Sequence, residues 1–282
     1  MLVDAMRTRL GSALFSRVAG PDGPANRARI HDTPGPRWFA LDSPVRAVHG
    51  DAAMFIGGIA ALLLQSLHPL AMAAVAGHSG YKGDPWGRLQ RTSTFLAVTT
   101  FGTEEHAQHA VDQVRAVHAR IRGTAPDGRA YRADDPHLLT WVYTAEAYCF
   151  LAAHQRFGAH PLDEEGRDRY VAEAARVARA LGADDAPSDL STLRRRLDAY
   201  RPELRATRDA RAAARFLLLT PPLPWAARPA YGVLAANAVG LLPGWARHAL
   251  LLPYVPVVEE TFIRAGGHGL TRTIRWAMRP PA

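Results

Sequence analysis

An uncharged run dominates the first third of the chain, since no Asp, Glu, Lys or Arg occurs from Ala52 to Tyr81. A run of this length could cross a bilayer as a helix. However, it contains Gly57-Gly58, Gln65, Ser66, His68, Pro69 and His78, and many of its other residues are alanine. We therefore expect a helix buried around a ligand over about residues 51–76, kinked or broken at Pro69 because proline interrupts helical hydrogen bonding. A membrane span is the alternative.

The rest of the chain also predicts helices joined by short loops. We expect them at about 4–18, 84–100, 103–123, 135–157, 163–181, 189–200, 207–219, 225–240, 243–251 and 255–277, the last interrupted at Gly266-Gly267. A passage rich in proline and glycine, up to about residue 50, is expected to wrap the surface in extended form. No useful strand alternation is visible, and GTAPDGRAYRADDP is expected to be a loop. The prediction is an all-α, single globular multi-helix domain (51–282) with an N-terminal extension (1–50).

Composition narrows the partners and the compartment. With 282 residues and 48% hydrophobic residues, the chain can build a core around a cofactor. The net charge of +8 would suit nucleic acid or an anionic membrane surface, but the basic residues are scattered, so we expect no nucleic-acid partner. Cys149 is the single cysteine, which excludes an intrachain disulfide. Because the N-terminal residues also lack a signal-peptide pattern, we expect a cytoplasmic protein.

Three groups of residues could carry chemistry. His118 falls on the apolar stripe of the helix expected at 103–123, where a buried imidazole is either a core residue bonded to a carbonyl or a ligand to metal or haem. Arg88, Arg91 and Thr92 share one helix, and their guanidinium groups could bind propionates or polarise oxygen, or could simply be solvated or paired with acids. His68, just before Pro69, could face a cavity or cap the broken helix. His78, His106, His109 and His137 are expected at loop or exposed positions.

Several familiar catalytic patterns are missing from the sequence. It has no P-loop, Rossmann glycine pattern, HExxH or nucleophile elbow. It also lacks Glu-x-x-His pairs and CxxCH, so neither a di-iron bundle nor covalently attached haem is expected.

The order of the segments resembles the latex-clearing-protein and mpaB-type haem oxygenase family. The likeness lies in residues 57–103, GGIAALLLQSLHPLAMAAVAGHSGYKGDPWGRLQRTSTFLAVTTFGT, followed by VRAVHARIRG (114–123), DDPHLLTWVY (134–143) and the later DAYRPELRATRDARAAARFLLLTPPLP. The resemblance implies an all-helical fold that holds one haem b (iron protoporphyrin IX). It places the iron ligand at His118 and distal polar residues at Arg88, Arg91 and Thr92.

Two positions depart from the family pattern. Rubber-cleaving members carry lysine where this chain has Arg91, which does not readily lose a proton. Many relatives carry histidine at the position of Tyr143, so a phenol would replace an imidazole beside the cofactor. Together with His68 and Arg88, Tyr143 completes the set of residues expected around the haem.

The sequence therefore predicts a haem-dependent oxygenase that acts with dioxygen on a small apolar substrate, by cleavage of a carbon–carbon double bond or by hydroxylation. Two alternatives remain open at this stage. One is a haem-binding or sensing protein without turnover, and the other is a helical interaction protein at a membrane surface.

Overall fold

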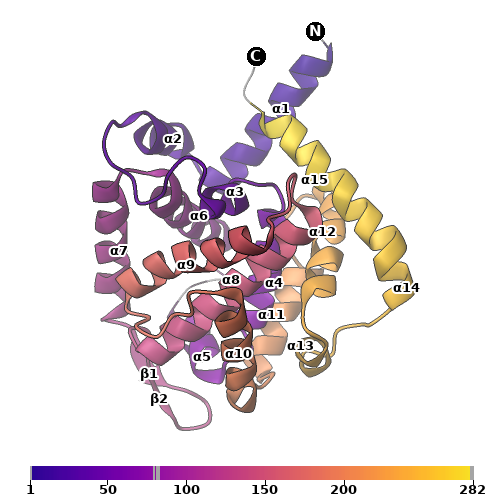
Figure 1. Cartoon of the computed structure of the whole chain (residues 1–282). Helices are drawn as coiled ribbons and strands as arrows, with labels where there is room; N and C mark the ends of the chain where they lie inside the picture. Colours follow the sequence, from indigo (N-terminus) through magenta and orange to yellow (C-terminus); the bar gives the residue numbers. More distant parts are fainter. Residues whose placement is uncertain (1, 79, 81–82, 280–282) are drawn as a thin grey trace.

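Two apolar helices form the centre of the molecule in the computed structural model, which describes residues 2–78, 80 and 83–279 (Figure 1). They are α4 (Met54–Gln65) and α8 (Pro136–Phe157), which pack against each other over much of their length. α4 is apolar on most of its faces, which is typical of a helix buried in a core. α5 (Pro69–His78) follows after a bend of 108°, so the break expected at Pro69 is confirmed.

Helices surround this pair on several sides, and the all-α class is confirmed. α8 also packs against α9 (Glu164–Leu181), α10 (Leu190–Tyr200) and α12 (Arg228–Leu241), while α4 packs against α12 and α11 (Arg208–Leu219). Short 3-10 turns precede α11 and α12, at Arg201–Glu203 (η1) and Trp225–Ala227 (η2). The buried residues of these helices form one large continuous core.

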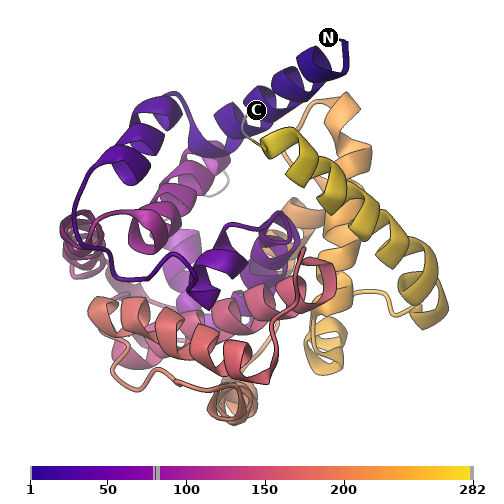
Figure 2. The same cartoon turned by 45° about the horizontal axis from the view of Figure 1, so that its top comes forward.

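The N-terminal region is more helical than its proline content suggests. Two short helices, α2 (Gly23–Asp32) and α3 (Pro44–His49), occupy the passage that we expected to be extended. Pro24 and Pro44 each lie in the first turn of their helix, where the missing N–H costs nothing. α1 (Leu2–Ala19) packs against α6 (Pro85–Phe101) and α15 (Arg264–Met278), and Figure 2 shows it beside the C-terminal end of α15.

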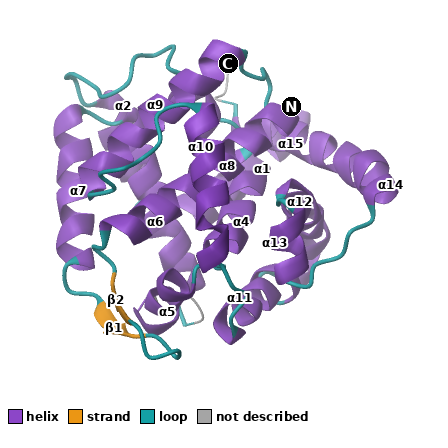
Figure 3. Cartoon of the chain, turned by 60° about the horizontal axis from the view of Figure 1, so that its bottom comes forward, coloured by secondary structure: helices purple, strands orange, loops and turns teal. Residues whose placement is uncertain are grey.

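α6 (Pro85–Phe101) and α7 (Glu104–His118) are consecutive helices in contact with each other. Both helices are capped at their starts, since the Asp84 carboxylate accepts from the Gly87 N–H and the Thr103 hydroxyl accepts from the His106 N–H. However, α7 ends at His118 instead of Gly123. The chain then forms an antiparallel hairpin of β1 (Arg122–Thr124) and β2 (Ala130–Arg132), visible at the foot of Figure 3, which corrects the loop expected there.

The C-terminal segment packs against α12 through its last helix and the turn before that helix. α13 (Gly244–Ala249) and α14 (Pro256–Val258) are short, and a π-helical turn (Glu259–Ile263, η3) leads into α15 (Arg264–Met278). Gly266-Gly267 does not interrupt α15, which corrects that expectation. A Cβ at Gly267 would lie 2.7 Å from the Asn237 side chain, so the glycine permits close approach of α12 and α15.

Among the described residues, no single helix has the length and apolar character needed to cross a membrane, although the bent pair α4–α5 would pass by length and composition.

Candidate functional site

His118 is the last residue of α7 and is half-buried. Its Nδ1 is buried without a hydrogen-bond partner among the described residues. Burial lowers the pKa of His118, and the nearby Asp134 carboxylate opposes this shift only in part. The ring is therefore held as a neutral imidazole, the form that binds metal. The buried stripe is narrower than predicted, because Ala107 and Val111 are buried whereas Val117 is 52% exposed.

Arg88, Arg91 and Thr92 lie on the N-terminal half of α6. These three residues lie near the start of α6, and His118 lies at the end of α7, so both positions are far along the chain from the turn at Gly102 that joins the two helices. Arg88 is half-buried, whereas Arg91 and Thr92 are exposed. The Arg91 guanidinium forms an ion pair with Asp84, with Nη1 3.3 Å from Oδ2, so its present partner is the cap of its own helix. A role of Arg88, Arg91 and Thr92 at a cofactor stays a prediction.

Tyr143 lies in the core of the molecule. Its hydroxyl reaches two backbone carbonyls, those of Val171 at 2.8 Å and Pro187 at 2.9 Å, and burial raises the pKa of the phenol. The hydrogen bonds of the hydroxyl thus connect α8 to α9 and to the loop before α10. This geometry supports a packing role and does not favour the cofactor contact expected for Tyr143.

His68 lies where α4 turns into α5, and its side chain is only 1% exposed. The structure groups it with His137 from the start of α8 and with Glu203 from η1, and ligand atoms of the three side chains lie within 4.8 Å of one another. The sequence did not bring these residues together, because they come from three separate segments and His137 was expected only at an exposed position. His137 is indeed exposed, with Nε2 2.9 Å from a Glu203 oxygen.

Glu146 is a second residue that the sequence did not single out. It is half-buried on α8, and its charge raises the pKa values of the buried Tyr143 and Tyr170. Desolvation raises the pKa of Glu146 to about 7, and no described residue forms a hydrogen bond or ion pair with its carboxylate. A carboxyl with a pKa near neutrality could exchange a proton at physiological pH.

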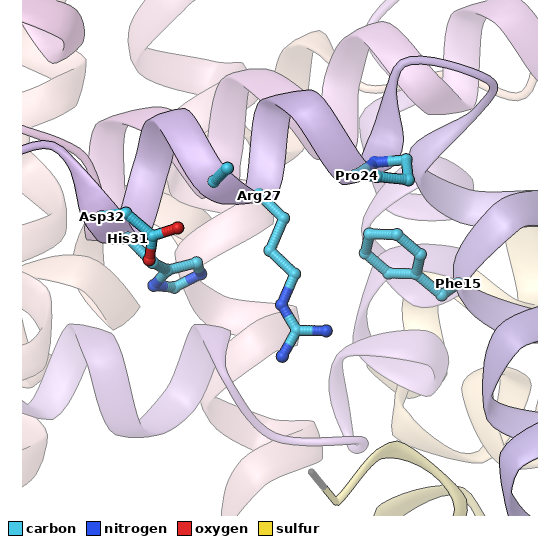
Figure 4. Close-up of a pocket in the computed structure, with 6 residues that line it drawn as sticks. Phe15, Pro24, Arg27, His31 and Asp32 are labelled. Carbon is cyan, nitrogen blue, oxygen red and sulfur yellow. The ribbon is translucent and has the colours of Figure 1, made fainter. Parts of the chain in front are cut away.

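Two surface hollows lie away from the predicted residues. One, of about 830 Å³, is lined by Pro126 of the hairpin and by α11, which contributes Arg208, Arg211 and Arg215. The other, of about 480 Å³, lies between α1 and α2, where Arg27 points toward Phe15 (Figure 4). Neither is lined by His118 or by Arg88, so the haem pocket expected from the sequence stays a prediction.

The helical chain matches a known protein family. It belongs to the family described as ER-bound oxygenase mpaB/B'/rubber oxygenase, catalytic domain, whose profile matches residues 46–276. The resemblance noted in the sequence is thereby confirmed.

The individual relatives match only part of the chain. Two uncharacterized proteins, from Mycobacterium bovis and Mycobacterium tuberculosis, are each 33% identical over 97 residues, or 34% of this chain. The matched part spans only 38% of the length of these curated relatives. No solved structure matches the chain.

Proposed function

We propose that this protein is a haem b-dependent oxygenase that uses dioxygen to cleave or hydroxylate a small apolar substrate. Membership of the oxygenase family supports the reaction class. The observation that carries the haem assignment is the buried Nδ1 of His118, which has no hydrogen-bond partner among the described residues. A buried polar atom without a partner costs roughly 1–3 kcal/mol, so chains seldom keep one that has no use.

His118 would hold the haem iron, because its neutral ring has a free electron pair to donate. When bound, the haem supplies an iron centre that can activate dioxygen, with the outcome set by the polarity and access of the pocket. Arg88 and Arg91 would hold the haem carboxylates or stabilise negative charge, since a guanidinium stays protonated at any physiological pH. The Thr92 hydroxyl can both donate and accept a hydrogen bond beside them.

Apolar side chains next to the predicted residues favour an apolar substrate. Leu89, beside Arg88, is 39% exposed, and Val117, beside His118, is 52% exposed. Exposed apolar side chains beside the cofactor would favour an apolar substrate, because its binding would remove apolar surface from water. A small isoprenoid-like or natural-product molecule would fit this chemistry.

Absorption spectroscopy of the purified protein tests the proposal. The wild type, expressed with added haem, should show a Soret band, and His118→Ala should abolish it or change its position. His109→Ala is the matched control, because His109 lies on the same helix but is exposed and bonded to Gln113. A Soret band of unaltered shape in His118→Ala, or no Soret band in the haem-supplied wild type, would contradict the assignment.

A further inference from the structure

Three ligand-type side chains converge at the end of α8, and the chain holds each of them in place. The backbone N–H of Arg205 donates to the Leu67 carbonyl at 2.8 Å, which fixes the segment after η1 beside the α4–α5 bend. That contact brings Glu203 next to His68, with 3.4 Å between Glu203 Oε2 and His68 Nε2. The elements are distant in sequence, so their meeting is a property of the fold.

His137 is oriented by a neighbour that leaves one ring nitrogen for the cluster. The Tyr200 hydroxyl donates to the His137 carbonyl at 2.8 Å and lies 3.3 Å from its Nδ1. The other nitrogen, Nε2, faces Glu203 at 2.9 and 3.0 Å from the two carboxylate oxygens. A ligating histidine characteristically has its second nitrogen held by such an outer partner.

The buried His68 is the observation that points to a ligand. Both of its ring nitrogens are buried and neither makes a hydrogen bond with a described residue, although Nε2 is directed at the carboxylate of Glu203. Its ring is enclosed by those of His137, Trp141 and Tyr200, with centroids 6.2 to 6.3 Å away. Nδ1 of His68 has no partner and Nε2 has only the 3.4 Å ion-pair contact with Glu203. An electron-pair acceptor between His68 and Glu203 would supply the closer partner that burial normally requires.

We propose that His68, His137 and Glu203 bind one divalent transition-metal ion, Zn²⁺ or Fe²⁺. Two imidazoles and one carboxylate form a ligand set characteristic of both ions. Metal–ligand bonds of about 2.0–2.2 Å place neighbouring ligand atoms roughly 3.0–3.5 Å apart, and the contacts of 2.9 and 3.4 Å to Glu203 are close to this range.

The exposure of the ligands indicates an open coordination sphere. His68 forms the buried floor, whereas the side chains of His137 and Glu203 are 52% and 39% exposed. The three protein ligands would bind the metal ion from the side of the protein, and water would fill the coordination positions that face solvent, as in metal sites that accept a further ligand. This site uses other residues than the His118 iron ligand of the proposed function and does not depend on it.

Metal titration of the full-length protein tests the proposal. Protein treated with a chelator would be titrated with Zn²⁺, followed by metal analysis after gel filtration, and with Co²⁺, followed by its visible absorption. Glu203→Gln and His137→Ala are the variants of choice, because both side chains are partly exposed and their loss should leave the fold intact, as circular dichroism would verify. His109→Ala and Glu105→Gln are matched controls on the exposed face of α7.

We expect one ion per wild-type chain, an affinity lowered by more than about tenfold in Glu203→Gln and His137→Ala, and no change in the two controls. Equal affinity in the wild type and Glu203→Gln would overturn the site, as would a wild type that retains no metal. His118→Ala distinguishes the two proposals, because it should lose the Soret band and keep the Zn²⁺ stoichiometry.

Discussion

The raised pKa of the Glu146 carboxyl predicts how the free energy of unfolding changes with pH, and by how much. The pKa is about 7 in the folded protein against an ordinary value of 4.5, because desolvation disfavours the carboxylate. The folded chain therefore binds this proton more tightly than the unfolded chain does, and between pH 4.5 and 7 unfolding releases it. The contribution of Glu146 to stability should fall as pH rises through this window and stay constant above it.

The magnitude is the difference between the two pKa values. About 2.5 pKa units at about 1.4 kcal/mol each give roughly 3.5 kcal/mol as an upper bound. Partial hydration of the half-buried side chain lowers the expected value to about 3 kcal/mol. Glu146→Gln keeps the shape and removes the charge. We expect it to match the wild type near pH 4.5 and to exceed it by as much as about 3 kcal/mol at pH 8.

Urea denaturation from pH 4.5 to 8.5 measures this difference directly. Glu105→Gln, on the exposed first turn of α7, is the control and should change the free energy of unfolding by less than about 1 kcal/mol. The reasoning fails if the gain from Glu146→Gln does not increase with pH, because Glu146 would then be ionised and stabilised in the folded state.

Three further predictions concern residues outside the proposed metal sites. Asp51→Asn should cost about 3 kcal/mol of unfolding free energy near pH 7, because it breaks the buried pair with Arg275, whose Nη2 lies 2.7 Å from Oδ1. Although burial opposes it, Arg275 and backbone N–H groups hold the pKa of Asp51 below its ordinary value, so the cost should shrink as pH falls through that pKa in acid denaturation. Tyr143→Phe should lower stability by about 1–2 kcal/mol in urea melts and leave any Soret band unchanged; an altered band would restore Tyr143 as a cofactor contact. Gly182→Ala should cost about 1–2 kcal/mol in thermal unfolding, because Gly182 ends α9 with φ of 107°, and an unchanged Tm would show that the turn relaxes.

Local signals in the sequence predicted most helix boundaries. Asp84 before Pro85 and Asp135 before Pro136 combine an N-cap with proline in the first turn, and both helices begin there. Pro24 and Pro44 also lie in the first turn of a helix, but neither helix has an N-cap side-chain hydrogen bond and both lie in a passage rich in proline, so α2 and α3 were not predicted. The β1–β2 hairpin was missed because three-residue strands give almost no periodic signal.

The candidate site could be predicted only in part, for a physical reason. His118 stood out because the stripe of a single helix is a local pattern. The grouping of His68, His137 and Glu203 depends on the direction of the bend after α4 and on the backbone contact between Leu67 and Arg205. Pro69 predicts the break but not its direction, and the backbone contact has no local signature. Tyr143 shows the converse, since its position in a motif suggested a cofactor, whereas the fold uses its hydroxyl to join α8 to α9.

The hydrogen bonds of the buried histidines distinguish rings that are anchored in the core from rings whose nitrogens could bind a metal. His154 Nδ1 is also buried without a partner, yet the other nitrogen of the ring lies 3.1 Å from the His160 carbonyl, so that side chain is anchored. His68 has no hydrogen bond on either nitrogen, and no described residue hydrogen-bonds the His118 ring. Each unmet hydrogen bond in a core costs about 1–3 kcal/mol, so a single unsatisfied nitrogen, as at His106, His118 and His154, is tolerable. His68 differs because both of its nitrogens are buried without a hydrogen-bond partner, so a metal ion bound there would stabilise the fold.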